Sequence, residues 1–322
     1  MKVWRDVAEV SADDKPSVAT VGNFDGVHRG HRHVVAQARE LADRLGGLPV
    51  VAVTFDPHPM TVIRPDLAPL ALATLDQRVS LLGLAGADAV LVVTFDEALA
   101  QTSPEDFVRD ILLDGVGAAG VVVGENFRFG HRAAGDVDLL RLLAAERGAE
   151  VVGLPLDGAH GETWSSSYIR SALAEGDVEA AAEALGRPYS VSGVVQRGEQ
   201  RGRELGFPTA NVPVSATSTA VPADGVYAGR LRRLDRDVDV WLPAAISVGT
   251  NPTFDGTQRT VESYVLDRDD LELYDVAVEV AFAERLRGME RFDSIDALIT
   301  QMRDDVDRAR ALLVGPSWGS TS

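Results

Sequence analysis

The pattern of strand and helix signals changes once along this chain of 322 residues, and that change constrains the fold more than any other feature. Before about residue 186, short apolar runs alternate with segments in which apolar residues recur at helical spacing. Near-continuous Val/Ala/Leu strands separated by helices predict an α/β domain with a buried parallel sheet, doubly wound and Rossmann-like. The expected strands are Val18–Val21, Val50–Phe55, Ala89–Phe95, Gly120–Val123 and Val151–Leu156. The expected helices run from near Arg32 to Leu45, from Ser103-Pro104-Glu105-Asp106 onward, and over Asp136–Arg147, Ser167–Ala174 and Asp177–Leu185.

The second part of the chain has a different, all-strand pattern. Gly186 followed by Pro188 marks the end of the last helix, because glycine stops helices and proline cannot continue them. Short strands joined by Gly- and Pro-rich loops, without intervening helices, predict a closed antiparallel β-barrel. The barrel strands are expected at Tyr189–Gln196, Gly225–Arg233, Val238–Val248, Thr260–Leu266 and Val276–Phe282.

A final amphipathic helix, Ser294 to about Leu313, is expected to pack on the barrel wall. The chain is long enough for two well-formed cores. We therefore expect two domains, residues 1–185 and residues 186–322.

Composition excludes several classes of function. The chain has no cysteine, so structural disulfides and thiolate metal sites are ruled out. A formal net charge of −18 argues against non-specific nucleic-acid binding, which needs a basic surface. The N-terminus has no apolar core of a signal peptide, and no long apolar window suggests a membrane span. We expect a cytoplasmic protein without nucleic-acid or membrane partners.

The segment Gly22 to His31, GNFDGVHRGH, lies between the first expected strand and the first expected helix. A helix N-terminus presents unpaired N–H groups and a partial positive charge, which suit a phosphate. Histidines at that position can donate hydrogen bonds to phosphoryl oxygens whose charge grows during transfer. His28 and His31 are therefore candidate catalytic residues. The alternative is an ordinary βα turn that needs its glycines for geometry and carries the histidines incidentally.

Three further segments are expected at the same edge of the sheet, because ligands bind beyond the carboxyl ends of parallel strands. Thr54–Pro59 follows the second strand, and its alternative is a proline-stiffened loop. Gly124–Gly130 combines glycines, an amide and two aromatic rings able to line a flat ligand, although such rings are more often core residues. Trp164–Arg170 places three serines at a helix start with an arginine one turn further, which suits a pyrophosphate, while a serine N-cap would explain one hydroxyl.

In the second domain, a Gly-rich basic segment, Gly198–Gly206, leads into Pro208-Thr209-Ala210-Asn211. Thr209 and Asn211 point to the same side of an extended segment and offer oxygen ligands suited to Mg²⁺ with nucleotide phosphates. Glu262 is a carboxylate inside an otherwise apolar strand, which costs free energy unless the group is paired or functional. The alternatives are a Gly-rich turn at a strand edge and a solvent-facing glutamate.

These strings resemble known enzyme families. His28–His31, an HxGH motif, together with Ser165–Arg170, an SSSxxR motif, resembles the nucleotidyltransferase superfamily. GNFDGVHRGH, TFDPHP and GENFRFG look like the adenylyltransferase module of prokaryotic bifunctional riboflavin kinase/FAD synthetases. PTAN, GVYAG, SVGTNPTF, VESYVLD, LYD and RGMERFDS look like the riboflavin kinase module, in order, and that module resembles a six-stranded barrel. The resemblance covers about residues 15–312.

The resemblance implies two ATP-dependent reactions: riboflavin is phosphorylated to FMN in the barrel, and FMN is adenylylated to FAD, with release of pyrophosphate, in the first domain. It implies Mg²⁺, ATP as co-substrate, and catalytic roles for Glu262, His28 and His31. ATP or phosphate binding is implied for Gly22, Asn23, Phe24, Asp25, Ser165, Ser166, Ser167, Arg170, Gly198, Arg201, Gly202, Gly206, Pro208 and Asn211. Flavin binding is implied for Pro57, His58, Asn126, Phe127, Phe129 and Arg287, and metal binding for Thr209 and Asn211. The small-molecule partners are then riboflavin, FMN and ATP, and a monomer or weak homo-oligomer is expected.

The chain departs from the family pattern at three places. Asn126 stands where the family often has Asp, Ser167 where it usually has Thr, and Thr163 where a basic residue is common. Three other functions stay open at this point. They are an adenylyltransferase whose barrel only binds flavin, a non-catalytic flavin-binding or regulatory protein, and a nucleotidyltransferase for another phosphate ester such as a pantetheine or glycerol phosphate.

Overall fold

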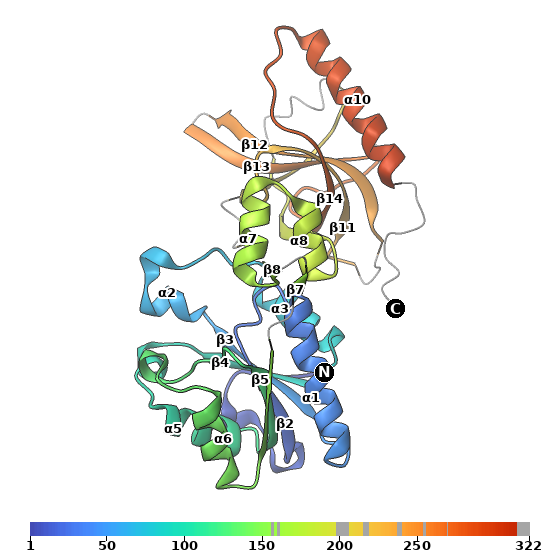
Figure 1. Ribbon diagram of the computed structural model, residues 1–322. Helices are drawn as coiled ribbons and strands as arrows, with labels where there is room; N and C mark the ends of the chain where they lie inside the picture. Colours follow the sequence, from blue (N-terminus) through green and yellow to red (C-terminus); the bar gives the residue numbers. More distant parts are fainter. Residues whose placement is uncertain are drawn as a thin grey trace. The chain divides into compact units, whose positions relative to one another are not determined.

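The computed structural model describes residues 1–155, 158–159, 162–197, 206–214, 219–236, 240–253, 256–268 and 270–313. The chain forms two compact units, Met1–Ser166 and Ser167–Ser322 (Figure 1). Within the described residues, no helix is both long enough and apolar enough to cross a membrane.

The first unit is built on a six-stranded sheet with the order β1-β4-β3-β2-β5-β6, and every neighbouring pair is parallel. This confirms the predicted doubly wound parallel sheet. The N-terminal edge strand was not predicted, because a three-residue strand with two exposed residues carries no periodic signal. The strands are β1 Lys2–Trp4, β2 Ser17–Val21, β3 Val50–Asp56, β4 Ala89–Thr94, β5 Ala118–Gly124 and β6 Glu150–Leu154, with a small hairpin of β7 Gly158–Ala159 and β8 Glu162–Thr163.

Helices cover both faces of this sheet, and this explains why its central strands are apolar at every position. One face packs against α1 and α3 through residues such as Val35, Leu41 and Leu82. The other packs against α6 and the π-helical turn Val108–Leu113 through residues such as Leu112 and Leu140. The helices of the first unit are α1 Arg29–Arg44, α2 Pro59–Ile63, α3 Leu75–Leu84, α4 Glu97–Ala100, α5 Pro104–Phe107 and α6 Val137–Ala145.

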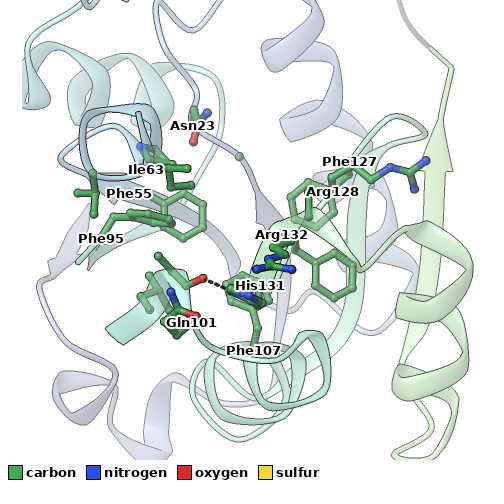
Figure 2. Close-up of a pocket in the computed structure, with 18 of the residues that line it drawn as sticks. Asn23, Phe55, Ile63, Phe95, Gln101, Phe107, Phe127, Arg128, His131 and Arg132 are labelled. Carbon is green, nitrogen blue, oxygen red and sulfur yellow. Dashed lines mark hydrogen bonds between the residues drawn. The ribbon is translucent and has the colours of Figure 1, made fainter. Parts of the chain in front are cut away.

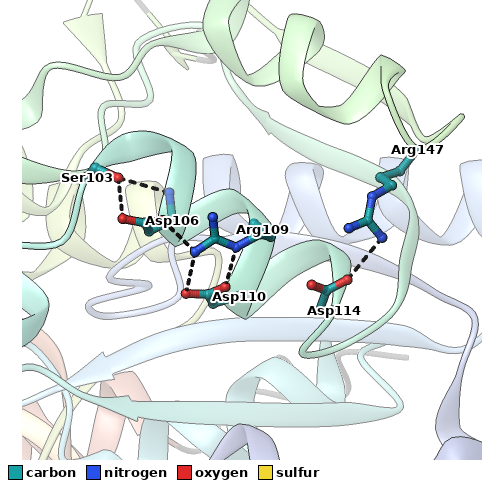
Figure 3. Close-up of polar contacts among 6 residues, drawn as sticks. All are labelled: Ser103, Asp106, Arg109, Asp110, Asp114 and Arg147. Atoms are coloured by element: carbon teal, nitrogen blue, oxygen red, sulfur yellow. Dashed lines mark hydrogen bonds and ion pairs between the residues drawn. The ribbon is translucent and has the colours of Figure 1, made fainter.

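The predicted helix start at Ser103 is present and capped as expected (Figure 3). The Asp106 N–H donates to the Ser103 hydroxyl at 3.0 Å, and that hydroxyl donates to the Asp106 carboxylate at 2.7 Å. Beyond the cap, Arg109 pairs with Asp110 and Arg147 pairs with Asp114, all on the surface. Much of the acidity of this region is therefore a solvated surface balanced by arginines, rather than a metal site.

The second unit contains a six-stranded antiparallel sheet with the order β10-β13-β12-β11-β14-β9. Its two edges approach each other, because the Gln196 N–H donates to the Asn211 carbonyl at 2.8 Å in an antiparallel bridge. The predicted barrel is thus confirmed as a nearly closed one. The strands are β9 Tyr189–Val194, β10 Ala210–Pro213, β11 Gly225–Arg233, β12 Leu242–Thr253, β13 Gly256–Val265 and β14 Ala277–Arg287.

In the described part of the second unit, three helices accompany the barrel: α7 Ser166–Glu175, α8 Val178–Leu185 and the C-terminal α10 Ile295–Leu313. α10 packs on the barrel wall as predicted, with Val306, Ala309 and Leu313 buried against residues of β11, β12 and β14. α8 ends at Gly186, which has a φ of 69°, a left-handed conformation that favours glycine. The predicted strand end Leu156 lies outside the described residues.

Candidate functional sites

The two histidines of the GNFDGVHRGH segment meet at the first turn of α1. Their rings stack with centroids 3.6 Å apart, and the His31 N–H donates to Nδ1 of His28 at 3.4 Å. His28 is the N-cap residue and is buried. A side chain at Gly30 would meet the His28 ring at 3.2 Å, so the glycine makes room for this packing. The motif thus places two imidazoles together at a helix N-terminus.

Burial holds the pKa of the His31 imidazole well below its ordinary value of 6.5, and the neighbouring His28 lowers it further. Nδ1 of His31 has no hydrogen-bond partner among the residues that the structure describes. Phe24 packs edge-on against the same ring at a centroid distance of 5.2 Å. His31 is therefore a neutral imidazole at neutral pH, set in an apolar wall beside His28.

The loop between β2 and α1 has an unusual backbone. Phe24 and Val27 are non-glycine residues with φ values of 47° and 42°, and Gly26 has a φ of 79°. The buried Asp25 carboxylate accepts the Leu72 N–H at 2.8 Å, which fixes the centre of the loop. Left-handed residues of this kind cost about 1–3 kcal/mol each and occur where the surroundings over-determine them, often at functional sites.

The serine segment reaches this loop through one of its three hydroxyls. Ser166 donates to the Asp25 carbonyl at 2.9 Å, and the Arg29 guanidinium lies over the Trp164 ring at 5.0 Å. The structure therefore brings Trp164 and Ser166 of this segment to the GNFDGVHRGH segment. Ser165 precedes this contact in the chain, whereas Ser167 and Arg170 belong to the second unit, and their roles toward the histidines stay predictions.

A pocket of about 800 Å³ opens at the carboxyl edge of the sheet (Figure 2). Its wall includes Gly22 and Asn23 of the histidine segment, so the pocket adjoins the loop described above. The three predicted flavin-binding residues of the GENFRFG segment, Asn126, Phe127 and Phe129, also line it. Their two rings stack with centroids 5.4 Å apart. The pocket has the size and the flat aromatic wall that a polycyclic ligand needs.

Pro57 and His58 are not among the lining residues, although their neighbours Pro59, Val62 and Ile63 are. His58 instead caps α2, with Nδ1 accepting the Met60 N–H at 3.2 Å. Its Nε2 lies 3.3 Å from Nδ2 of Asn23. Pro57 and His58 thus stand next to the pocket, and a direct contact with flavin stays a prediction.

Sequence reasoning missed part of the aromatic wall. Phe55, Phe95 and Phe107 line the pocket as well, and the Phe55 and Phe95 centroids are 5.8 Å apart. A signal was present, because Phe55 is the penultimate residue of β3 and Phe95 directly follows β4. Aromatic residues at the carboxyl ends of adjacent parallel strands must meet at one edge. Arg128 and Arg132 add cations to the same wall.

In the barrel, strand pairing brings together two residues 51 positions apart in the sequence. Asn211 on β10 and Glu262 on β13 are directly opposed partners in an antiparallel register. Both are half-buried, whereas Ala210, Val212, Val261 and Ser263 between and beside them are buried. The Thr260 hydroxyl donates to Glu262 Oε1 at 3.2 Å. The two side chains therefore share one face of the strand pair.

Thr209 precedes this pair and is half-buried. It is two residues before Asn211 and therefore on the same side of the extended segment. Asn211 Nδ2 donates to the Thr209 carbonyl at 3.4 Å. Gly206, with a φ of 88°, and Pro208 are exposed where the chain enters β10. The predicted phosphate-binding residues Gly198, Arg201 and Gly202 lie outside the described residues.

Arg287, predicted to bind flavin, is held by an acid of the C-terminal helix. Its guanidinium donates to both oxygens of the buried Asp305 carboxylate, at 2.8 to 3.1 Å. It also lies over the Phe292 ring at 5.7 Å. These contacts tie the end of β14 to α10, so a flavin contact by Arg287 would use a side chain that is already anchored.

Two family models match this chain, one in each half. The family model described as FAD synthetase matches residues 10–168, and the one described as riboflavin kinase matches residues 185–313. The bifunctional riboflavin kinase/FMN adenylyltransferase of Pseudomonas fluorescens is 38% identical over 97% of this chain and 98% of its own length. This chain belongs to that bifunctional family. The protein of the same description from Bacillus subtilis is 33% identical over 93% of each chain.

Members of the bifunctional riboflavin kinase/FMN adenylyltransferase family carry two transferase domains, and this chain has them in the predicted order. The FAD synthetase domain comes first and the riboflavin kinase domain second. A crystal structure from Streptococcus pneumoniae, described as a macrolide-efflux protein, shares 29% identity and a TM-score of 0.83 over 96% of this chain and 98% of that one. The alternatives with only one activity, with no activity, or with another phosphate ester are not supported by these matches.

Proposed function

We propose that FMN adenylylation takes place where the stacked histidines adjoin the aromatic pocket, and riboflavin phosphorylation where Asn211 faces Glu262. The single observation that carries the first assignment is that Gly22 and Asn23 belong both to the histidine segment and to the pocket wall. A flavin ring between the phenylalanines would thus have its phosphate directed toward the first turn of α1. Pro57, His58, Asn126, Phe127 and Phe129 are the proposed flavin-binding residues of this site.

In the adenylyl transfer, an oxygen of the FMN phosphate forms a bond to the α-phosphorus of ATP. The bond from that phosphorus to the bridging oxygen breaks, and pyrophosphate leaves. Because His28 Nδ1 accepts the His31 N–H, a neutral His28 carries its proton on Nε2 and can donate it as a hydrogen bond to a phosphoryl oxygen. His31 stabilises the same charge as a neutral donor. Gly22, Asn23, Phe24 and Asp25 with the N–H groups of the loop hold the nucleotide phosphates.

The serine segment completes this proposed phosphate site. Ser166 is tied to the loop by its bond to the Asp25 carbonyl. From the sequence motif alone, we propose Ser165, Ser167 and Arg170 as further donors to the leaving pyrophosphate. No covalent intermediate on the enzyme is required, since positioning and charge stabilisation suffice for such transfers.

In the kinase reaction, the riboflavin 5′-hydroxyl oxygen forms a bond to the γ-phosphorus of ATP, the bond to the β–γ bridging oxygen breaks, and ADP leaves. Glu262 accepts the hydroxyl proton as general base. From the sequence, Gly198, Arg201, Gly202, Gly206 and Pro208 are the proposed phosphate-binding residues of this domain. Arg287 is its proposed flavin-binding residue.

The donor set around Asn211 fits Mg²⁺. A hydroxyl, an amide oxygen and a nearby carboxylate are hard oxygen ligands, and Mg²⁺ in kinases uses one or two protein ligands together with substrate phosphates. Among the described residues no cluster of three or more His, Cys, Asp or Glu competes as a metal site. Thr209 and Asn211 would hold the ion, which supplies charge neutralisation on the transferring phosphate when bound.

We assign the adenylyltransferase to residues 1–185 and the kinase to residues 186–322. The FAD synthetase match ends at residue 168 and the riboflavin kinase match begins at residue 185, which supports a functional boundary there. A monomer or weak homo-oligomer and a cytoplasmic location stay predictions from the sequence.

The test is to supply riboflavin with Mg-ATP and to separate FMN from FAD by chromatography. We expect His31→Ala to accumulate FMN with FAD synthesis reduced by about 100-fold or more, because it removes a charge-stabilising group. We expect Glu262→Ala to reduce FMN formation by at least about 100-fold, while FAD still forms from added FMN.

Two matched variants control for general effects of substitution. His33→Ala removes an exposed histidine from the same helix, and Glu284→Ala removes a half-buried glutamate from another barrel strand. Both should leave FMN and FAD formation intact. If His31→Ala or Glu262→Ala silenced both reactions in a folded protein, the assignment of the two sites would be wrong.

A further inference from the structure

A buried arginine on α3 contacts the β2–α1 loop and the end of β3, next to the proposed adenylyltransferase site. It has no role in the mechanism proposed above. Arg78 is 7% exposed. Its Nη1 atom donates to the Asn23 carbonyl at 3.0 Å, to the Thr54 hydroxyl at 3.2 Å and to the Phe55 carbonyl at 2.9 Å. Its Nη2 atom lies 3.5 Å from a carboxylate oxygen of Asp56. One guanidinium therefore joins two separate strand ends.

The two strand ends are those that shape the site. Asn23 lies in the loop that follows β2, and Thr54, Phe55 and Asp56 form the end of β3. The Asn23 carbonyl accepts a second bond from the Thr54 hydroxyl at 3.1 Å. Burial lowers the pKa of Arg78, whereas the carboxylates of Asp25 and Asp56 raise it. Since arginine keeps its proton in proteins, a full positive charge lies in contact with the Asn23 carbonyl of the loop.

Fixing one carbonyl also fixes the direction of the next N–H group. In a trans peptide the C=O and N–H groups point to opposite sides, so an Asn23 carbonyl held inward turns the Phe24 N–H outward. The peptide bonds of this loop are trans. Phe24 then has its strained φ of 47°, and the loop continues to His28. The arginine thus acts on the conformation that presents backbone donors and histidines to a phosphate.

We propose that Arg78 is a positioning residue for adenylyl transfer: it holds the left-handed β2–α1 loop in the conformation that binds the triphosphate and aligns His28. The inference rests on the proposed function of that loop. Arg78 does not touch the reacting atoms. Its contribution is to keep the loop formed before substrate arrives, so that binding energy is not used to order it.

The fold provides a matched control at the opposite edge of the same sheet. Arg39 on α1 donates to the Leu48 carbonyl at 3.3 Å and to the Gly86 carbonyl at 3.2 Å, and it pairs with Asp88. It thereby joins the segments that enter β3 and β4, as Arg78 joins those that leave β2 and β3. Arg39 is far along the strands from the histidine loop, so its loss tests what an arginine bridge contributes to stability alone.

The experiment compares Arg78→Met, Arg78→Lys and Arg39→Met in the full chain. FAD formation from FMN and Mg-ATP is measured for kcat and for KM of each substrate, with riboflavin kinase activity and thermal midpoint measured on the same samples. We expect Arg78→Met to lower kcat of FAD formation and raise KM for ATP, with kcat/KM reduced on the order of 100-fold. Kinase activity should stay within about twofold. Arg78→Lys should recover part of the loss, because it restores a cation that reaches fewer acceptors.

Arg39→Met should lower the thermal midpoint while leaving the kcat and KM values of FAD formation unchanged. Equal losses of FAD formation in Arg39→Met and Arg78→Met, or wild-type kinetics in Arg78→Met, would overturn the proposal. If Arg78→Met does not fold, Arg78→Lys decides, because wild-type kcat/KM for ATP in that variant would also overturn it. Failure of the underlying function is distinguishable: His31→Ala would then retain FAD synthesis, whatever the Arg78 variants do.

Discussion

The two sites of this protein place their functional side chains by different means. In the first domain, the proposed phosphate-binding residues lie in the loop beyond β2 and the two histidines at the start of α1, with Phe24 and Val27 in left-handed conformations. In the barrel, Asn211 and Glu262 stand on paired strands, and their meeting follows from the register alone. A loop in a strained conformation needs buried groups to hold it, whereas a strand register is held by the whole ladder.

The difference predicts where remote substitutions act. Removing a buried arginine beneath the loop should change catalysis in the first domain, as proposed for Arg78. Removing an arginine that pairs with a buried carboxylate of the barrel wall should change only stability, because the ladder of β10 and β13 remains.

The largest expected effect is on the metal dependence of the kinase. Asn211→Leu removes an oxygen ligand without disturbing the backbone pairing, so the Mg²⁺ concentration for half-maximal FMN formation should rise at least about 10- to 100-fold. Adenylyl transfer from added FMN should keep its wild-type Mg²⁺ dependence. Asn211→Asp, which keeps an oxygen at this position, is the matched control. An unchanged Mg²⁺ titration for Asn211→Leu would remove this residue from the metal site.

The next effect concerns stability alone. Glu279 on β14 is buried, accepts from the Ser190 hydroxyl at 2.5 Å and pairs with Arg232 of β11 at 2.6 Å. Arg232→Met leaves this carboxylate without its cation and should cost on the order of 3 kcal/mol in the free energy of unfolding. The folded fraction should keep the kinase kcat, because β10 and β13 are untouched.

Denaturant unfolding of Arg232→Met, Glu279→Met and the double variant provides the check. The double variant should be more stable than Arg232→Met, since no unpaired carboxylate remains in the barrel wall. A kinase kcat that falls together with stability would show that catalysis in the barrel depends on ion pairs remote from the site, as is proposed for the loop of the first domain.

The smallest effect is a pH dependence that belongs to the first domain. Burial lowers the pKa of His31 in the folded protein below its ordinary value of 6.5, so below pH 6.5 the unfolded chain binds more protons than the folded one. Stability should therefore fall as the pH is lowered through this window, by at most about 1.4 kcal/mol per pH unit. Above pH 6.5 the contribution of His31 to the free energy of unfolding is constant. The unfolding free energy of wild type minus that of His31→Gln should be smaller at pH 5 than at pH 7, and an unchanged difference would contradict a lowered pKa of this imidazole.

Local signals in the sequence were sufficient for most of the fold. Central strands buried on both faces show as continuous Val/Ala runs, and Ser103, Asp136 and Asp177 cap the helices that they were expected to begin. The capping box of Thr74 and Gln77 is a local signal for α3, the helix that carries Arg78, although α3 was not predicted. β1 has too few residues to show a period.

Only those parts of the candidate sites that lie within local motifs could be predicted from the sequence. The HxGH segment and the Thr209–Asn211 pair predict the chemistry, because particular donors at particular spacings suit phosphate and Mg²⁺. That Asn211 faces Glu262 depends on the pairing of β10 with β13, and that the Asn23 carbonyl meets Arg78 depends on packing across the sheet edge. Neither contact has a local signal, since both join residues far apart in the chain.

The central claim is that the chain contains two separate sites for ATP-dependent transfer, each complete without the functional side chains of the other. The most direct measurement mixes His31→Ala with Glu262→Ala and supplies riboflavin with Mg-ATP. FMN made by the first variant should be converted to FAD by the second, so FAD should appear after a lag, whereas a chain carrying both substitutions should form neither product. A mixture that accumulates FMN but never forms FAD, although Glu262→Ala is folded, would contradict the account.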